Sequence, residues 1–457
     1  MIERAWVLGL GSYAALVGLA PTAGARLALA APVAILPVAW WTLAAPARWV
    51  SSFLLAAVLL PPLPIALGDS GPHPALLFAL LGVFAYASRF DALRIEANFL
   101  TGSLLALLAA LLLSLPFAAL YSGAEIAAAS MLRVALFAIS LAVFAWTAYG
   151  PEQAFLSVRV MFGAATVSAL FGCIDFYFQW PAPAGYGPQF VWLASGVYRR
   201  AQGLFYEAST LGNFCVFFLV MVVVALVQGA KKITTVSRPV LIGGATIILV
   251  ALIFSYSRAS LLNLAVAMMS LALLNRRRIH VRRAAGVTLL ALSVAVLAAH
   301  AAFPAFVESY WLRLSGSFVY FLQYTEDVLS GRLESWRTLL TFLADHPWSA
   351  IFGVGYKTLP YSDIAGRPVI ADNMYLSLLV ETGWVGLTAL VAASLAILRA
   401  GWQSARSDRA EAAFFGTWIF CFWTGQMVQM LSGDLLTYWR VLPLYFWVLA
   451  RAVRISA

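Results

Sequence analysis

The sequence predicts an all-α, polytopic integral membrane protein with about 12 to 14 transmembrane helices. Hydrophobic residues make up 63% of the 457 positions and charged residues only 11%, whereas a soluble domain carries about 25% charged residues. Runs of about twenty apolar residues recur along almost the whole chain, and each can cross a hydrocarbon layer of about 30 Å as a helix. No strand-like alternation of polar and apolar residues competes with them.

The apolar runs divide the chain into three regions. The predicted helices lie near residues 5–20, 26–43, 49–67, 74–88, 99–118, 131–149, 155–178, 209–228, 239–256, 259–274, 284–302, 374–398, 411–431 and 436–452. We therefore expect an N-terminal transmembrane bundle over 1–302 and C-terminal transmembrane helices over 373–457. The region between them, 303–372, is predicted to be a long loop that contains amphipathic helices.

The distribution of Lys and Arg orients the predicted helices, because short loops rich in these residues stay in the cytoplasm. One set of alternate connections is basic, and its strongest run is NRRRIHVRR at 275–283. The other set is expected to face outward: 68–73, 121–130, 179–208, 303–372 and 432–434. This topology accounts for much of the net charge of +10. The chain is thus expected to contact membrane lipids, and nucleic acid is not an expected partner.

Cysteine, histidine and glycine patterns predict no cofactor. The three cysteines, Cys173, Cys215 and Cys421, lie inside apolar runs without CxxC spacing, which is typical of small buried residues. The four histidines are scattered too widely for their spacing to indicate a metal site. A GxxxxGK loop and a dinucleotide fingerprint are both lacking. These patterns therefore indicate no metal site, and ATP is not an expected energy source.

Three outward stretches carry arginines against the general charge trend, so these arginines need another explanation. The first, VYRRAQGLFYEASTLGNF, contains Arg199, Arg200 and Glu207 and leads into the span near 209. The second, FSYSRASLLN, places Arg258 among serines in a very short turn, with no carboxylate nearby in the sequence. The third begins with Arg332. A guanidinium holds phosphate oxygens bidentately and keeps its charge, which favours a diphosphate ligand.

The stretch GRLESWRTLLTFLAD at 331–345 predicts an amphipathic helix at the membrane surface. Its apolar residues recur at helical intervals through Leu333, Trp336, Leu339, Leu340 and Leu343. Arg332 and Trp336 lie one turn apart on the same side, whereas Arg337 lies on another side, where a solvated face is the alternative explanation. Pro347 ends this helix, and GVG at 353–355 permits a tight turn toward the span that ADN at 371–373 opens.

These outward residues resemble the signature of the O-antigen ligase and polymerase superfamily, which is roughly GRxxxW, a PxxGxG turn and HNxxLxxxxExGxxG. The matching positions are Gly331, Arg332, Trp336, Pro347, Gly353, Gly355, Asn373, Leu376, Glu381, Gly383 and Gly386. The turn reads PWSAIFGVG here, with a longer gap after the proline. SRA at 257–259 resembles the family's SRG-type element, and RRAQGLFYEAS resembles its upstream RxxGxF element. The matches span 199–386 in the family's order.

The resemblance implies a GT-C-type fold in the bacterial inner membrane, with an active site facing the periplasm. It also implies an inverting, metal-independent glycosyltransferase whose donor is a glycan linked to undecaprenyl diphosphate. In the polymerases of this family the acceptor is the glycan of another lipid-linked unit, and in the ligases it is the lipid A core. A chain-length regulator is a further expected partner.

By motif position, the resemblance assigns the diphosphate-binding arginines of the family to Arg258 and Arg332, with Arg199 or Arg200 as a third. The family's general base, a histidine in the ligases, corresponds to Asp372. A carboxylate can accept the proton of a sugar hydroxyl. Its presence favours a polymerase or an exopolysaccharide enzyme over a lipid A core ligase.

Four further residues are candidates for substrate binding: Glu207, Trp336, Arg337 and Asn373. His346 is a rival general base, although its place beside Pro347 at a helix end favours a capping role. Glu207 is a second rival.

A transporter or flippase of a lipid-linked or anionic solute is the alternative from a different class. Such a protein needs polar or broken helices near the middle of the bilayer. The candidate polar residues are Asp175, Gln179, Gln426 and Gln429. They are few and lie mostly toward the ends of the predicted spans, whereas the arginines gather in outward loops, so a transferase is favoured.

Overall fold

A computed structural model describes most of the chain and is mostly helical. The described residues are 12–13, 15–19, 36–43, 47–63, 73–88, 93–150, 156–182, 186–193, 196–275, 304, 307–312, 315 and 332–454. The predicted spans at 5–20 and 26–43 are described only in part. The span at 284–302, the basic run from 276 to 283 and Gly331 lie outside the described residues.

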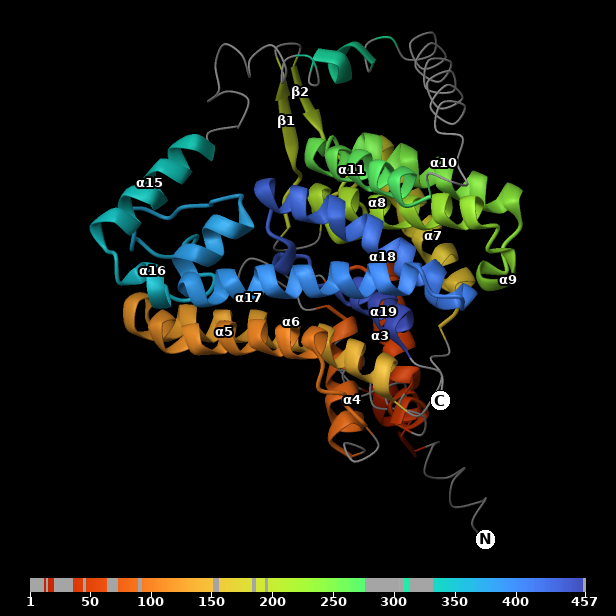
Figure 1. Cartoon of the computed structure of the whole chain (residues 1–457), viewed down its shortest axis with the longest axis horizontal. Helices are drawn as coiled ribbons and strands as arrows, with labels where there is room; N and C mark the ends of the chain where they lie inside the picture. The colour runs from red at the N-terminus through yellow and green to blue at the C-terminus, as the bar shows by residue number, and fades with distance from the viewer. Residues whose placement is uncertain are drawn as a thin grey trace.

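The remaining predicted spans are all helices (Figure 1). The helices are α3 (Ala47–Leu59), α4 (Ala75–Ser88), α5 (Phe99–Ser122), α6 (Ala124–Tyr149), α7 (Val158–Phe178), α8 (Ala208–Gln228), α9 (Lys231–Thr234), α10 (Arg238–Phe254), α11 (Arg258–Leu274), α15 (Arg332–Asp345), α16 (Ser349–Phe352), α17 (Met374–Ala405), α18 (Ala410–Gln429) and α19 (Leu442–Val453). Among the described residues, five helices are long and apolar enough to cross a membrane, namely α5, α6, α7, α8 and α17. The fold is therefore that of an all-α polytopic membrane protein.

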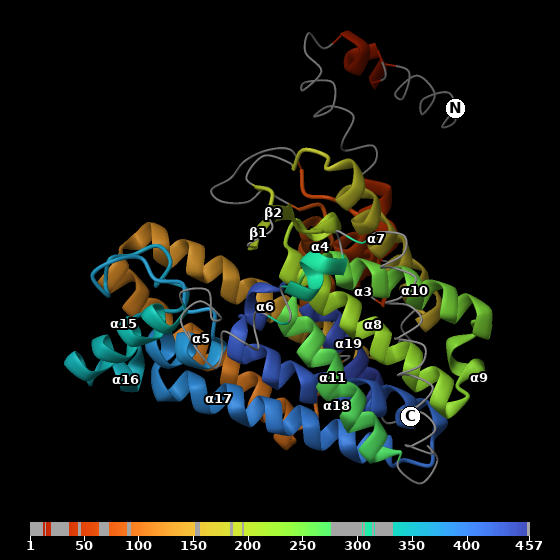
Figure 2. The same cartoon turned by 90° about the horizontal axis from the view of Figure 1, so that it is seen from above.

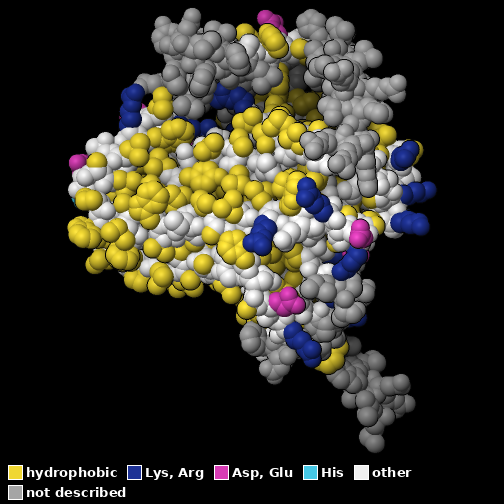
Figure 3. All heavy atoms as spheres, viewed as in Figure 1, with side chains coloured by type: hydrophobic (Ala, Val, Ile, Leu, Met, Phe, Trp, Pro, Cys, Tyr) yellow, Lys and Arg dark blue, Asp and Glu magenta, His cyan; other side chains and the backbone are white. Residues whose placement is uncertain are grey.

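Helix α8 lies at the centre of the bundle, where it contacts α10, α11 and α18. Helix α17 packs between α5 and α18. The long helices run roughly parallel, with α15 and α16 at one end and α9 at the other (Figures 1 and 2). Helices α8, α11 and α17 all begin at the α15 end and finish at the α9 end. The apolar flank between the two ends, shown in Figure 3, is suited to contact with lipid.

A short β-hairpin accompanies the helices, although the sequence shows no strand-like alternation. Strand β1 (Phe190–Leu193) pairs antiparallel with β2 (Gly196–Arg199), and Phe190 lies opposite Arg199. Each strand has four residues, which is too short for alternation of polar and apolar residues to stand out in the sequence. The hairpin matters because it ends directly before Arg200.

Two helix boundaries also differ from the prediction. The expected outward loop at 121–130 is reduced to Gly123, which has φ +88° and separates α5 from α6. The start of α6 consists mainly of alanines with one glutamate, and these residues favour helix. The few polar residues of 121–130 therefore do not interrupt the helices. Helix α3 ends at Leu59 rather than near 67, because Pro61 and Pro62 lack the N–H groups that would continue it.

The predicted amphipathic helix is confirmed as α15, and it belongs to a small core of its own. Its buried residues pack with the following loop and the first turns of α17; the members of this second core are Leu339, Phe342, Val354, Leu359, Val369, Ala371 and Val380. Burial of these side chains holds α15 and the loop to the end of the bundle.

The backbone of the loop after α16 forms hydrogen bonds to α17 at a kink in that helix. Gly383 has φ +68° and ψ −170° inside the helix, so the carbonyls before it are open to other partners. Val354 N–H donates to Val380 O (3.0 Å) and Gly355 N–H donates to Glu381 O (2.8 Å). A Cβ at Gly383 would lie 2.1 Å from the carbonyl oxygen of Ile351. The motif glycines therefore permit close backbone contact at the kink.

We expect Gly383→Ala to destabilise the protein by about 2 to 4 kcal/mol, because the new Cβ clashes with backbone and the left-handed φ is unfavourable for alanine. Thermal unfolding of the purified protein in detergent measures this. The matched control is Gly163→Ala in α7, where an added Cβ meets nothing within 4 Å. Equal melting temperatures for the two variants would contradict the role of the kink.

Candidate functional site

Charged residues from separate segments converge at the α15 end of the bundle. Arg200 follows β2 and Glu207 precedes α8, while Arg258 and Arg332 are the first residues of α11 and α15. Asp372 directly precedes Asn373, which caps α17. Three helices, α8, α11 and α17, therefore begin at this site. Their N-terminal ends carry partial positive charge and add to the attraction of the arginines for an anion.

Arg200 lies against the turn between α10 and α11. Its Nε donates to the carbonyl oxygen of Ser255 at 2.8 Å. Burial lowers the pKa of Arg200, Glu207 raises it, and the positive charges of Arg258 and Arg332 lower it. The three guanidinium groups thus lie near one another, although they come from segments far apart in the sequence.

Arg332 and Asp372 form an ion pair, with Arg332 Nε 3.1 Å from Asp372 Oδ2. The side chain of Asp372 remains 48% exposed, so a substrate can approach it. The indole N–H of Trp336 donates to Ala371 O at 2.7 Å, and the side-chain oxygen of Asn373 caps α17. These contacts hold Asp372 in place from both sides, at a left-handed φ of +47° that aspartate tolerates better than most residues.

Glu207 is a half-buried second carboxylate of the site. Its Oε2 accepts a hydrogen bond of 2.6 Å from the Thr210 hydroxyl. The pKa of Glu207 is raised, mainly because the carboxyl is buried, and the negative charge of Asp372 also raises it. The Thr210 hydrogen bond and the positive charges of Arg200 and Lys357 lower this pKa but do not reverse the shift. Glu207 and Asp372 are therefore close enough to influence each other's charge.

Lys357 belongs to the site, although the sequence analysis did not single it out. Its ammonium forms an ion pair with Asp434, and the two side chains are only 10% and 14% exposed. Burial lowers the pKa of Lys357, but Asp434 and Glu381 raise it more. The sequence feature that could have indicated Lys357 is its place in a loop predicted to face outward, where positive charge is uncommon, as it is for the outward arginines. Its pairing ties the loop to the connection between α18 and α19.

Arg199 is directed away from this cluster. Its Nη2 lies 3.4 Å from Asp175 Oδ1 on α7 and donates to Trp180 O at 2.9 Å. The sequence did not rank Arg199 and Arg200, and the geometry groups Arg200, not Arg199, with Arg258 and Arg332.

Two other predicted residues lie on α15 or directly after it. Arg337 is exposed on α15. His346 lies just after α15, where its Nδ1 is 3.2 Å from the Phe342 carbonyl oxygen and its ring stacks on the Phe342 ring at 4.7 Å. These contacts fit the capping role expected of His346.

A buried network of amides lies next to the arginines. Asn213 Nδ2 on α8 and Asn263 Nδ2 on α11 each donate to Gln429 Oε1 on α18 at 2.8 Å, and both also contact Gln426 Oε1. Gln429 Nε2 in turn donates to Ser260 Oγ at 3.2 Å. The glutamines considered for a transport path thus bind neighbouring helices and fix the start of α11.

Within the described residues, no group of three or more His, Cys, Asp or Glu side chains is placed to hold a metal ion. The independence from metal and other cofactors stays a prediction.

The fold and this cluster define a polytopic membrane protein with a group of arginines and carboxylates at one end of its helices. Residues 243–391 match the family model described as O-antigen ligase, a stretch that includes Arg258, Arg332, Trp336 and Asp372. The match supports a membrane glycosyltransferase family of the O-antigen ligase and polymerase type, in agreement with the resemblance in the motifs. A search of curated proteins found no match.

We expect inorganic pyrophosphate to raise the melting temperature of the purified protein, because it binds the folded arginine cluster. Saturation at about a hundredfold excess over Kd would add about 2.7 kcal/mol of stability. Arg200→Gln and Arg258→Gln should each reduce the shift. Arg367→Gln, which removes an exposed arginine paired with Glu334, should leave it unchanged. An equal shift in all variants would place pyrophosphate elsewhere.

Proposed function

We propose that this protein polymerises O-antigen or exopolysaccharide glycan from undecaprenyl-diphosphate-linked donors at the periplasmic face of the bacterial inner membrane. The observation that supports this best is the convergence of Arg200, Arg258 and Arg332 beside two carboxylates in a chain with a match to the O-antigen ligase family. Membrane lipids and a chain-length regulator are proposed as its partners.

The arginines stabilise the leaving group. When the bond between the anomeric carbon and the phosphate oxygen breaks, its electron pair goes to the diphosphate of the carrier lipid. Arg200, Arg258 and Arg332 already surround this position with positive charge, so they need little rearrangement as the negative charge develops. This arrangement can supply the charge stabilisation without a metal ion.

Asp372 is the proposed general base. It removes the proton of the acceptor hydroxyl, whose oxygen then forms the new bond to the anomeric carbon from the face opposite the departing phosphate. The configuration at that carbon is therefore inverted. Asp372 suits this role because half of its side chain is accessible and the surrounding backbone is fixed by the contacts of Trp336 and Asn373.

The direct test supplies the purified protein with an undecaprenyl-diphosphate oligosaccharide and a metal chelator, without ATP. We expect a ladder of longer lipid-linked glycans. Arg258→Gln and Arg332→Gln should lower the rate by about 100- to 1,000-fold, the usual effect of removing one preorganised donor, while Arg367→Gln retains it.

Other products would overturn parts of this proposal. Transfer only to an added lipid A core would identify a ligase. Movement of unchanged donor across a vesicle membrane would identify a transporter. Activity that is restored only when a divalent metal is added back would contradict metal independence.

Asp372→Asn should lower the rate by about 100-fold or more and keep the fold, because asparagine also tolerates a left-handed φ. Glu207→Gln should cost less. The competing outcome is full activity in Asp372→Asn and loss in Glu207→Gln, which would make Glu207 the base. Burial raises the pKa of Glu207, so Glu207 becomes protonated at a higher pH than an ordinary glutamate. If it is the base, activity should therefore be lost at that higher pH as the solution is acidified.

A further inference from the structure

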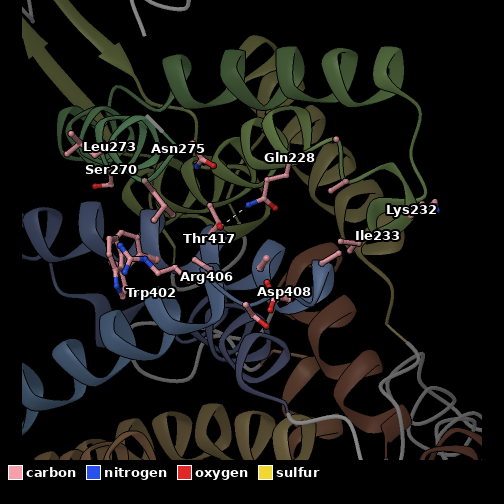
Figure 4. A pocket seen from close by; sticks show the side chains of 18 residues that line it. Gln228, Lys232, Ile233, Ser270, Leu273, Asn275, Trp402, Arg406, Asp408 and Thr417 are labelled. Atoms are coloured by element: carbon pink, nitrogen blue, oxygen red, sulfur yellow. Dashed lines mark hydrogen bonds between the residues drawn. The ribbon is translucent and has the colours of Figure 1, made fainter. Parts of the chain in front are cut away.

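A large cavity lies at the opposite end of the bundle from the arginine cluster. Its volume is about 1260 Å³, and it is formed by the ends of α8, α11 and α17, by α9 and by the start of α18 (Figure 4). Helix α8 alone separates the two ends by 21 residues, or about 32 Å at 1.5 Å per residue. This is about the thickness of the hydrocarbon layer, so the cavity belongs to the other membrane surface.

The cavity combines apolar walls with cationic groups. Leu273, Leu274 and Phe420 contribute apolar surface, while Lys232 and Arg406 contribute positive charge. The guanidinium of Arg406 lies 3.9 Å from the ring centroid of Trp402. Tryptophan is typical of the interface between lipid headgroups and acyl chains.

The other polar groups of the cavity leave this charge balance positive. Gln228 Nε2 donates to Thr417 Oγ1 at 2.9 Å, so these two uncharged groups pair with each other on the wall. Among the charged residues of the lining, Asp408 is acidic, whereas Lys232 and Arg406 are basic. The lining therefore carries two cationic side chains and one anionic side chain.

We propose that this cavity binds one anionic phospholipid of the adjacent leaflet. Its phosphate contacts Lys232 and Arg406, and its acyl chains lie along the apolar walls. The positive-inside trend and the negative ends of three helices explain cations at this surface, but they do not explain a large cavity with apolar walls. A small soluble anion would leave those walls in water, whereas basic pockets between transmembrane helices suit anionic headgroups.

The test reconstitutes the full chain in nanodiscs with equal amounts of phosphatidylglycerol and phosphatidylcholine, followed by transfer to detergent and native mass spectrometry. We expect retained phosphatidylglycerol in preference to phosphatidylcholine. The double variant Lys232→Gln/Arg406→Gln should reduce its retention about 25-fold, since each Lys or Arg near an anionic surface contributes about fivefold.

The matched control is Lys231→Gln/Arg399→Gln, which removes two exposed cations outside the lining and should retain the lipid. Ala413→Phe keeps the charges but fills space inside the cavity, so it should also lose the lipid. Equal loss in the two double variants, equal retention of both lipids, absence of retained lipid, or unchanged retention in Ala413→Phe would overturn the proposal. Binding is measured without turnover, so the outcome is independent of the proposed transferase activity.

Discussion

The mutual repulsion of three guanidinium groups is the constraint on which the arrangement of the α15 end depends. Arg200, Arg258 and Arg332 are held where their charges disfavour one another. Glu207 and Asp372 offset part of this repulsion, and the remaining positive charge favours an anionic ligand. The fold must hold these groups in place before that ligand arrives, because the free energy of ligand binding would otherwise be used to overcome their repulsion.

Rigid supports around each arginine meet this requirement. The Ser255 carbonyl fixes Arg200 at the α10–α11 turn, and the amide network of Asn213, Asn263 and Gln429 fixes the start of α11 against α8 and α18. A buried amide network has a defined geometry, since each unsatisfied amide would cost free energy in an apolar bundle. The apolar packing of the helices thus also determines the positions of the charges.

The sequence predicts the bundle better than the site because the two depend on different ranges of interaction. A run of apolar residues such as α8 is a local signal, and its length alone indicates a span. The extents of α5 and α6 were misjudged at Gly123, where a single glycine, not a loop, separates two helices. The hairpin before Arg200 was missed because its strands are so short.

Side-chain direction and distant pairing explain what the sequence could not predict in the site. Arg199 and Arg200 are neighbours at the end of a strand, where successive side chains point to opposite sides, so composition cannot separate them. Lys357 and Asp434 meet only through the fold, across 77 positions. Arg258, Arg332 and Asp372 could be predicted as site residues because they lie in the motifs that resemble the family. The family match covers these three residues as well, whereas Arg200 and Glu207 lie before its first residue.

The kink at Gly383 divides the site between two supports. The first turns of α17 bond to the loop through Val354 and Gly355 and share the second core with α15, so Arg332 and Asp372 are held by this smaller unit. Met374 and Leu378 of the same turns belong to the main core and join the two supports. Arg200 and Arg258 are instead carried by the main bundle. A diphosphate bound by all three arginines would therefore contact both supports. The packing that joins the two supports sets the distance between the general base and the arginines before the donor arrives, so the precision of this packing limits how well the acceptor hydroxyl can be aligned with the donor.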